Sequence, residues 1–532
     1  AHALGASSYS VQYGSAPPHA GSLLAGTPEL GPEFFQITAN VTDPLGTVQR
    51  YTWADSAGTL RRTQANGPHE GERFATRSYQ NGLVVREVDF NGQANEYAWD
   101  VRRRLQTRSS YAAGRPEQQT VETEWHPQFR LPVRITEQGR ETLNVYDGKG
   151  NLTRRTITDT STSQQRTWVW AYLASGLVES LTEPNGAVWR YGYDAAGNRT
   201  LVTDGLGRTT SRTFDAAGRM VSETRPGGLT TAFGYDARGR LILVNHAGEI
   251  SQLAYTDAGS LQSITHANGH VVTYTYDAAQ RQTGVQDNRG VSIAYTLDAA
   301  GNRTREEIRD GSGGIAQLIS RTINAVGRVS AVRGASGQST TYAYDANGVP
   351  VSETDPLNQT TRQTLDALGR PVATTFADSA AATQAFNALD ALTQVTDPKG
   401  VTTRYTTNAF GEVTSETSPD IGTISYQRDA NGEVTRIEDA RGQITTIERD
   451  AIGRIQRIAY ADGQQVAYTY DAAGYLARLE DASGVSVFTR DALGRVLTRT
   501  QDVNDTPAAP SRFRVAYTWH PGGAVASITY PS

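Results

Sequence analysis

Apolar and polar side chains alternate along much of the chain with a period of two. In Thr273–Asp277, tyrosines fall on one face and threonines on the other. Such alternation in β-forming residues predicts a strand that runs into a turn. The turn is Tyr193-Asp194-Ala195-Ala196-Gly197-Asn198-Arg199, and it recurs at Phe214–Arg219 and Tyr235–Arg240. Its aspartates stand at 194, 215 and 236, a spacing of 21 residues that predicts a repeat architecture.

The repeated unit is a β-hairpin. Its Asp accepts backbone N–H bonds at the first position of a type I turn, and the Gly takes the position that needs a positive φ. A second strand, such as Arg199–Thr203, follows the turn. A second turn comes mid-repeat, as at Glu183–Gly186, Asp397–Gly400 and Asp439–Gly442. Each repeat therefore adds one hairpin to a growing sheet.

Two segments follow from this pattern. Residues 1–35 are rich in Gly, Ala, Ser and Pro, and we expect a lead-in or linker with little structure. Residues 36–532 hold about 22 hairpin repeats of 20–27 residues, with turn positions from Ala54 to Thr518. The longer repeats carry their extra residues in the second turn, at Gln64–Glu72, Ser109–Gln119, Thr158–Gln165, Arg309–Gly314 and Gln501–Ser511. Because alternate turns lie on opposite edges, these loops should gather on one edge, where a neighbouring layer or a partner is met.

The predicted fold class is all-β. Twisted sheets of more than about 10 strands curl, split or close, so some forty strands cannot stay flat. With strands ~4.8 Å apart, the ribbon is ~210 Å long and rolls into a ring ~65 Å across, too wide for side chains to fill. We expect a coiled antiparallel β-ribbon that forms a hollow shell, or part of one.

Composition narrows the class of protein. The net charge of −5 and the pI near 6.0 do not suggest binding of nucleic acid or of an anionic membrane. The hydrophobic share of 37% suits a thin wall better than a thick core. There are no cysteines, which excludes disulfides and thiolate metal sites. No apolar run approaches the ~18 residues of a membrane span, and no signal peptide is visible. A start at Ala1 suggests a processed product or a fragment.

The turns carry a family resemblance. The Tyr-Asp-x-x-Gly-Arg turns, with x-Asp-Pro-x-Gly between them, resemble the YD repeats of Rhs (rearrangement hot spot) proteins over residues 36–530. Tyr146–Thr153 and Trp125–Ile135 are also typical of that family. The resemblance extends to Tc-toxin C components and teneurins, and it implies a β-cocoon. In bacteria, such a cocoon encloses a C-terminal toxin until delivery, often by a type VI secretion spike with PAAR and VgrG proteins and a chaperone. An autoprotease region at the end of the shell releases the toxin.

The chain departs from the full family pattern. No PAAR-like segment precedes residue 36, and the 14 residues after Thr518 leave no room for an autoprotease or toxin domain. Asp43-Pro44-Leu45-Gly46 resembles the cleavage signature but occupies the place of an ordinary turn. We therefore expect a non-enzymatic shell segment that encapsulates the toxin of a secreted effector. The alternative is an extracellular YD-repeat adhesin that binds carbohydrate.

Candidate chemistry is sparse. Successive turn aspartates lie one hairpin apart, ~10 Å, too far for an acid–base pair or a shared calcium ion. His266 and His270 flank a tight turn, but no third metal ligand can be named. No HExxH, P-loop or GxSxG motif occurs, so we expect no catalytic, cofactor-binding or metal-binding residues.

Two ladders of side chains remain. Arginines follow the turn glycine at Arg199, Arg219, Arg240, Arg303, Arg328, Arg370, Arg454 and Arg495. They either pair with acids of neighbouring hairpins or form a charged rim that contacts cargo or a partner. The tyrosine stripe either packs the wall or offers stacking platforms to sugar rings.

Overall fold

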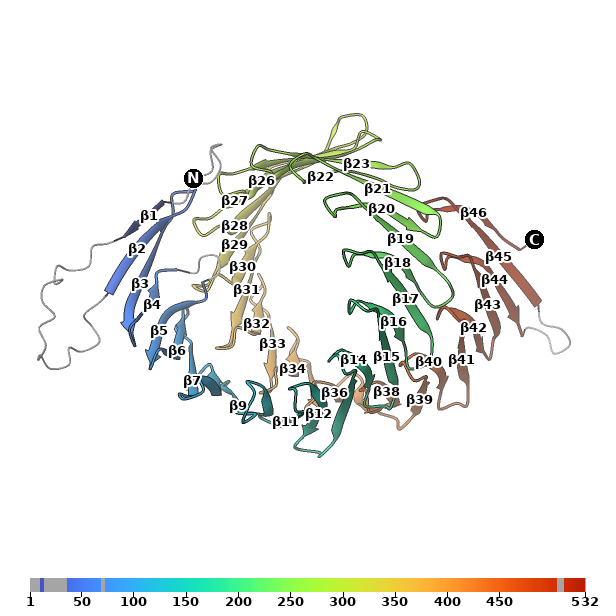
Figure 1. Ribbon diagram of the computed structural model, residues 1–532, viewed down its shortest axis with the longest axis horizontal. Helices are drawn as coiled ribbons and strands as arrows, with labels where there is room; N and C mark the ends of the chain where they lie inside the picture. Colours follow the sequence, from blue (N-terminus) through green and yellow to red (C-terminus); the bar gives the residue numbers. More distant parts are fainter. Residues whose placement is uncertain (1–9, 14–35, 68–71, 505–510, 532) are drawn as a thin grey trace, which may run out of the picture. The chain divides into compact units, whose positions relative to one another are not determined.

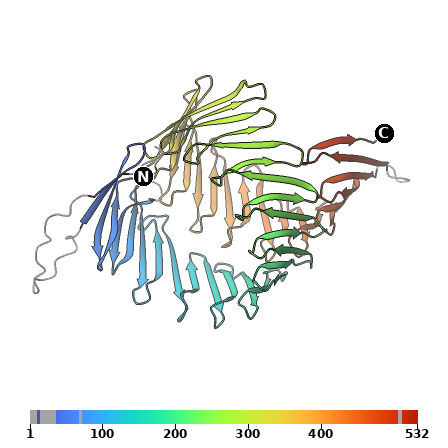
Figure 2. The same cartoon turned by 45° about the horizontal axis from the view of Figure 1, so that its top comes forward.

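We describe a computed structural model, which covers residues 10–13, 36–67, 72–504 and 511–531. These residues form 46 β-strands and no helix, in one long antiparallel sheet (Figure 1). Each resolved pairing joins strands that are consecutive in the chain, so the sheet grows hairpin by hairpin, as predicted (Figure 2).

The strands have the following bounds: β1 Ser10–Tyr13, β2 Gln36–Thr42, β3 Val48–Ser56, β4 Thr59–Ala65, β5 Phe74–Gln80, β6 Leu83–Asp89, β7 Ala94–Asp100, β8 Leu105–Tyr111, β9 Gln119–Trp125, β10 Pro132–Glu137, β11 Arg140–Tyr146, β12 Leu152–Asp159, β13 Gln165–Tyr172, β14 Val178–Thr182, β15 Val188–Tyr193, β16 Arg199–Thr203, β17 Thr209–Phe214, β18 Met220–Thr224, β19 Thr230–Tyr235, β20 Leu241–His246, β21 Glu249–Tyr255, β22 Leu261–Thr265, β23 Val271–Tyr276, β24 Gln282–Asp287, β25 Ser292–Leu297, β26 Arg303–Arg309, β27 Ile315–Ile323, β28 Val329–Gly334, β29 Ser339–Tyr344, β30 Pro350–Thr354, β31 Thr360–Leu365, β32 Pro371–Thr375, β33 Ala381–Phe386, β34 Leu392–Thr396, β35 Thr402–Thr407, β36 Val413–Ser418, β37 Gly422–Arg428, β38 Val434–Glu438, β39 Ile444–Arg449, β40 Ile455–Ala459, β41 Gln465–Tyr470, β42 Leu476–Asp481, β43 Gly484–Arg490, β44 Val496–Val503, β45 Ser511–Trp519 and β46 Val525–Thr529.

The turn between β17 and β18 shows the local design. The backbone N–H of Gly218 donates to the Asp215 carbonyl at 2.9 Å, and that of Asp215 donates to the Arg219 carbonyl at 2.9 Å. The Asp215 carboxylate accepts the N–H groups of Ala217 and Arg219 at 2.9 and 3.0 Å. Gly218 has φ 75°, and the strand register shifts beside Phe214. This is the predicted type I turn with a glycine bulge.

Predictions for the ends of the chain need correction. The sequence placed the first hairpin turn at Ala54, but the turn between β3 and β4 is Ser56–Thr59. It placed the last turn at Thr518, but the turn between β45 and β46 is His520–Ala524. Ser10–Tyr13, inside the expected lead-in, form β1 and pair with β2, because Ser-Val-Gln-Tyr alternates like the other strands. The other residues of segment 1–35 lie outside the described part of the chain.

The sheet is a wall one layer thick. Among the described residues, the buried apolar side chains are mostly alanines, and the largest fully buried side chain is that of Asp159. The accessible surface is 31044 Å² for 57.5 kDa, against about 19,000 Å² for a compact protein of this mass. Most strand residues are therefore half-buried by neighbours in the same sheet, and both faces of the wall stay open.

The chain divides into two compact units, each built from two segments far apart in the sequence. Unit 1 combines residues 1–141 and 274–402, and unit 2 combines residues 142–273 and 403–532. Within each unit, second turns of the earlier segment contact Asp-x-x-Gly turns of the later one. We call this line of contacts the seam.

In unit 1, the seam consists of hydrogen bonds between turns. The Thr47 hydroxyl donates to the Ala325 carbonyl at 2.7 Å. The Asn347 side chain accepts the N–H of Phe90 at 2.8 Å and donates to the Asp89 carboxylate at 2.7 Å. Turns some 250 to 280 residues apart thus lie side by side.

In unit 2, the seam includes charged pairs. The N–H of Ala409 donates to the Asp159 carboxylate at 2.8 Å. The Arg166 guanidinium donates to both oxygens of Glu412 at 2.8 and 2.7 Å. Glu249 accepts from Arg495 at 2.7 Å and from the N–H of Gly522 at 2.9 Å.

Two of the five inserted loops meet a neighbouring layer at the seam, as predicted, and second turns without insertions, such as those at Asp43 and Asp89, do so too. Loop Thr158–Gln165 supplies Asp159, and Gln119, at the end of loop Ser109–Gln119, donates to Asp390 at 2.6 Å. Parts of the loops Gln64–Glu72 and Gln501–Ser511 lie outside the described residues.

Candidate functional site

The turn aspartates are structural. In the turn at Asp215, the carboxylate caps two backbone N–H groups and also accepts from the Arg219 guanidinium at 2.7 Å. These bonds, the Arg219 side chain first, hold the pKa of Asp215 below its usual value. The expectation that the ladder of aspartates serves the turns is confirmed.

The arginine ladder ties each hairpin to the next. Arg370 shows the full set of contacts: Nε donates to Asp366 of its own turn at 2.7 Å, and Nη1 donates to the Asn387 carbonyl of the next turn at 3.1 Å. Its guanidinium also lies 5.0 Å from the ring centroid of Phe386. Arg454 repeats this arrangement with Asp450 and Tyr470.

The predicted pairing with acids of neighbouring hairpins holds only in part. Arg370 pairs with Asp390 of the next hairpin at 2.8 Å, but the carboxylate that recurs along the ladder is that of the same turn, four residues earlier, because the bulge brings the two ends of the turn together. The turn of Arg328 has Asn324 at this place. Arg199 and Arg303 differ, since an Asn takes the position after the turn glycine; each stacks instead on a tyrosine of the preceding strand, at 5.4 and 3.8 Å. Contact of an arginine rim with cargo or a partner stays a prediction.

The tyrosines before the turns pack the wall. The Tyr235 hydroxyl donates to the Met220 carbonyl at 2.8 Å, and Tyr193 and Tyr470 make the matching bond to Val178 and Ile455. Each bond reaches the preceding hairpin. This confirms wall packing for these residues, whose hydroxyls are engaged in the sheet.

Three repeats in which arginine stands at the tyrosine position support this assignment. Arg428, Arg449 and Arg490 occupy the tyrosine position, and each donates to the equivalent carbonyl. In the same repeats, the position after the turn glycine, which holds Arg elsewhere, is occupied by Glu412, Glu433 and Tyr475. Each of these side chains faces the arginine at the tyrosine position. The two positions therefore act as a pair that joins successive hairpins.

Other candidates from the sequence form no site. The rings of His266 and His270 stack at 5.7 Å. Within the described ranges, no three His, Cys, Asp or Glu side chains are grouped to hold a metal ion. Asp43–Gly46 forms an ordinary capped turn, with the Gly46 N–H donating to the Asp43 carbonyl at 3.0 Å. No helix in the part of the chain that we describe is long and apolar enough to cross a membrane.

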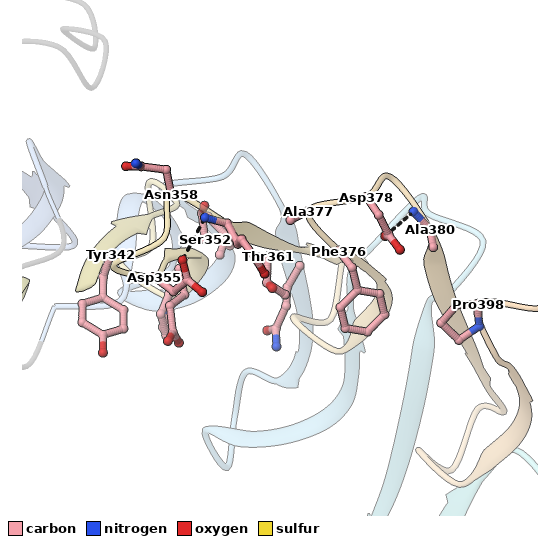
Figure 3. Close-up of a pocket in the computed structure, with 15 residues that line it drawn as sticks. Tyr342, Ser352, Asp355, Asn358, Thr361, Phe376, Ala377, Asp378, Ala380 and Pro398 are labelled. Atoms are coloured by element: carbon pink, nitrogen blue, oxygen red, sulfur yellow. Dashed lines mark hydrogen bonds between the residues drawn. The ribbon is translucent and has the colours of Figure 1, made fainter. Parts of the chain in front are cut away.

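Unit 1 contains a groove that the sequence reasoning missed. Its volume is about 1240 Å³, and it is lined by residues of β29, β30 and β31 and of the turns that follow β30, β32 and β34. Tyr342 and Phe376 project to the same side of the ribbon (Figure 3). We define the groove by Tyr342, Glu353, Asp355, Gln363, Phe376 and Asp378.

The groove exists because a column of large side chains is interrupted. The third residue before the turn is aromatic in many repeats, as in Tyr295, Tyr342 and Tyr405, but it is Gln363 and then Gln384 in two consecutive repeats. Arginine replaces the aromatic side chain at Arg212 and Arg321, where it pairs with a glutamate. Glutamine at this position in two consecutive repeats is the signal that the sequence offered. The signal predicts a groove only when the face of the sheet that the aromatic column lines is known.

Comparisons with known proteins agree with this design. Residues 128–305 match the sequence profile of the teneurin YD-shell, and residues 324–348, 386–423, 428–464 and 449–486 match the RHS repeat. No curated protein matches the chain significantly.

A solved structure shows the same fold. The crystal structure of TcdB2-TccC3 is similar with a TM-score of 0.62 and 14% identity, over 91% of this chain and 31% of that one. The Photorhabdus luminescens Tc holotoxin pore has a TM-score of 0.48 and 14% identity, over 93% of this chain and 32% of that one. The chain thus spans about a third of the length of these structures. The repeats, the turn chemistry and the fold together make this chain an Rhs/YD-repeat protein.

Proposed function

We propose that the chain is a non-enzymatic segment of a shell that encloses the toxic polypeptide of a secreted polymorphic toxin. The observation that carries this proposal is the single-layer wall. A sheet of 46 strands that buries almost no large apolar side chain gains little from its own interior. Its stability rests on bonds within the sheet and along the seam. Such a wall needs no packed interior, so it can surround a cavity.

The seam explains how such a wall holds together without a core. Hydrogen bonds and ion pairs join turns some 250 residues apart, so successive layers of ribbon are sealed edge to edge. In the proposed shell, these contacts within each unit hold the wall together around the enclosed polypeptide.

The route of export belongs to the same proposal. The family resemblance supports a protein made in the bacterial cytoplasm and exported by a type VI secretion system, with a PAAR and VgrG spike and a chaperone as partners. The enclosed toxin is the main partner, and we propose neither a nucleic-acid partner nor a membrane span for the shell itself.

The test is the mass of the gene product purified without denaturant, compared with its mass after denaturation. We expect further polypeptide to co-purify and to separate only on denaturation. A native particle that contains this chain alone contradicts enclosure.

The alternative function, an extracellular adhesin that binds carbohydrate through rows of tyrosines, has weaker support. Tyr193, Tyr235 and Tyr470 are half-buried and use their hydroxyls within the wall, so they do not form a free row of platforms. Tight binding of glycans by a particle without any second polypeptide would favour the adhesin.

A further inference from the structure

The groove of unit 1 has an unusual distribution of charge. Three carboxylates line it, from Glu353, Asp355 and Asp378, and its lining residues include no lysine, arginine or histidine. Lys399 follows the lining residue Pro398, at the end of the groove away from Tyr342 (Figure 3). Arg362 is nearby on β31, but its neighbours Thr361 and Gln363 line the groove, so its side chain points to the other face of the strand. The groove is therefore a negative surface whose lining residues carry no positive charge.

Two of these carboxylates are available to a ligand. Glu353 is exposed and makes no hydrogen bond or ion pair with any residue that the structure describes. Asp378 uses one oxygen, Oδ1, to accept the N–H of Ala380 at 3.0 Å. By contrast, Glu223, at the place equivalent to Glu353, pairs with Arg212 and Arg225.

Aromatic rings stand at both sides of Glu353, and Asp378 lies beyond Phe376 (Figure 3). Tyr342 pairs across the sheet with Glu353, and Glu353 pairs with Thr361 on the next strand. Phe376 follows Thr375 at the end of β32 and is 39% exposed. Three strand spacings separate the two rings, ~14 Å, which is the length of about four extended residues.

From this geometry we infer that the groove binds a basic segment of a polypeptide, with lysine or arginine side chains between Tyr342 and Phe376. Carboxylates without counterions attract ammonium and guanidinium groups, and aromatic faces add cation–π attraction. This inference goes beyond the proposed function, because it holds for a basic segment whether the chain encloses it or meets it from outside.

The same chain supplies matched controls. Tyr405 and Glu416 repeat the pair Tyr342 and Glu353, but Tyr426 stands where the groove has Gln363, and Glu416 is half-buried. The turn Tyr460–Gln464 repeats the turn Phe376–Ala380, with Asp462 capping Gln464 as Asp378 caps Ala380. These sites carry the same charged side chains, but the column of aromatic side chains beside them is not interrupted by glutamine.

The experiment measures binding of a labelled octa-arginine peptide to the full chain by fluorescence anisotropy at 0.15 M salt, where surface charges are screened beyond ~8 Å. The variant E353Q/D378N removes two charges and keeps the oxygen that caps Ala380. We expect saturable binding that weakens about tenfold in E353Q/D378N, in keeping with the loss of charge-assisted contacts. We expect less than a twofold change in the control E416Q/D462N.

A third variant tests the shape of the groove. Q363Y restores the aromatic column and leaves all charges in place, so it should also weaken binding of the peptide. The inference is overturned if octa-arginine does not bind, if E416Q/D462N weakens it as much as E353Q/D378N, or if a neutral oligosaccharide binds and is lost only in Q363Y.

Discussion

The seam of unit 2 can be tested by one substitution, Glu412→Gln. Glu412 accepts two bonds from Arg166 at 2.8 and 2.7 Å, and the two side chains are only 19% and 12% exposed. The guanidinium also lies 3.9 Å from the ring centroid of Phe410, which holds it in place. The bonds from Arg166 and Asn408 outweigh burial and keep the pKa of Glu412 below its usual value.

The expected loss follows from this geometry. Removing one partner of a largely buried, bidentate pair leaves the arginine without a counterion and costs about 2 kcal/mol here, less than a fully buried pair. That free energy corresponds to ~30-fold more frequent opening of the seam. The effect should be local, because the other contacts along the seam remain.

Hydrogen exchange followed by mass spectrometry reads this opening directly. The Ala409 N–H donates to Asp159 across the seam, whereas the N–H groups of Ser161 and Thr162 donate to Asp159 within its own turn. In E412Q, a peptide containing Ala409 should exchange ~30-fold faster, while one containing Ser161 and Thr162 should change less. The double variant R166M/E412Q should exchange less fast than the two single effects predict, because both remove one interaction.

A matched control is Glu433→Gln, at the same turn position one repeat later. Glu433 lies 3.6 Å from Arg449, is 50% exposed and belongs to one segment of the ribbon only. We expect no change in exchange at Ala409 for this variant. Exchange in E412Q that stays within threefold of the native rate, or that matches E433Q, would refute the reasoning.

Three further predictions concern pH, the hairpin pairs and the turns. Burial raises the pKa of Asp159, but bonds from Ser161 and Ala409 outweigh it and leave the pKa lowered. Its contribution is therefore present above the unfolded value near pH 3.9 and is lost as the pH falls below it, so exchange at Ala409, corrected for its intrinsic pH dependence, should accelerate below about pH 4. R454E should destabilise its hairpin by about 1 kcal/mol, and R454E/Y470R should recover at least half, because it copies the pair of Glu433 and Arg449; proteolysis rates measure both. Ser379 has φ 70°, so S379G should stabilise its turn by about 0.5–1 kcal/mol, whereas G218A should destabilise its turn by about 1 kcal/mol, both read by thermal unfolding.

Local chemistry explains what the sequence could predict. The turn at Asp215 depends on contacts within four residues, all visible in Asp-x-x-Gly-Arg. The partner of Arg219 was harder to predict, because aspartates occur both four residues before it and one repeat away. Only the folded bulge shows that the near one is within 2.7 Å.

The seam and the groove depend on how hairpins accumulate. No local pattern relates Arg166 to Glu412, since their meeting reflects small rotations summed over about a dozen hairpins. The inserted loops predicted only which edge of the sheet would make a contact, and not which residues would meet there. The two glutamines at Gln363 and Gln384 were visible, but their meaning required the position of Tyr342 and Phe376.

The most direct test of the account is an image of the native particle by electron cryo-microscopy. The account predicts a wall one β-sheet thick, with interior density that does not belong to the YD repeats. A solid particle in which β-sheets pack face to face over a common core would contradict it.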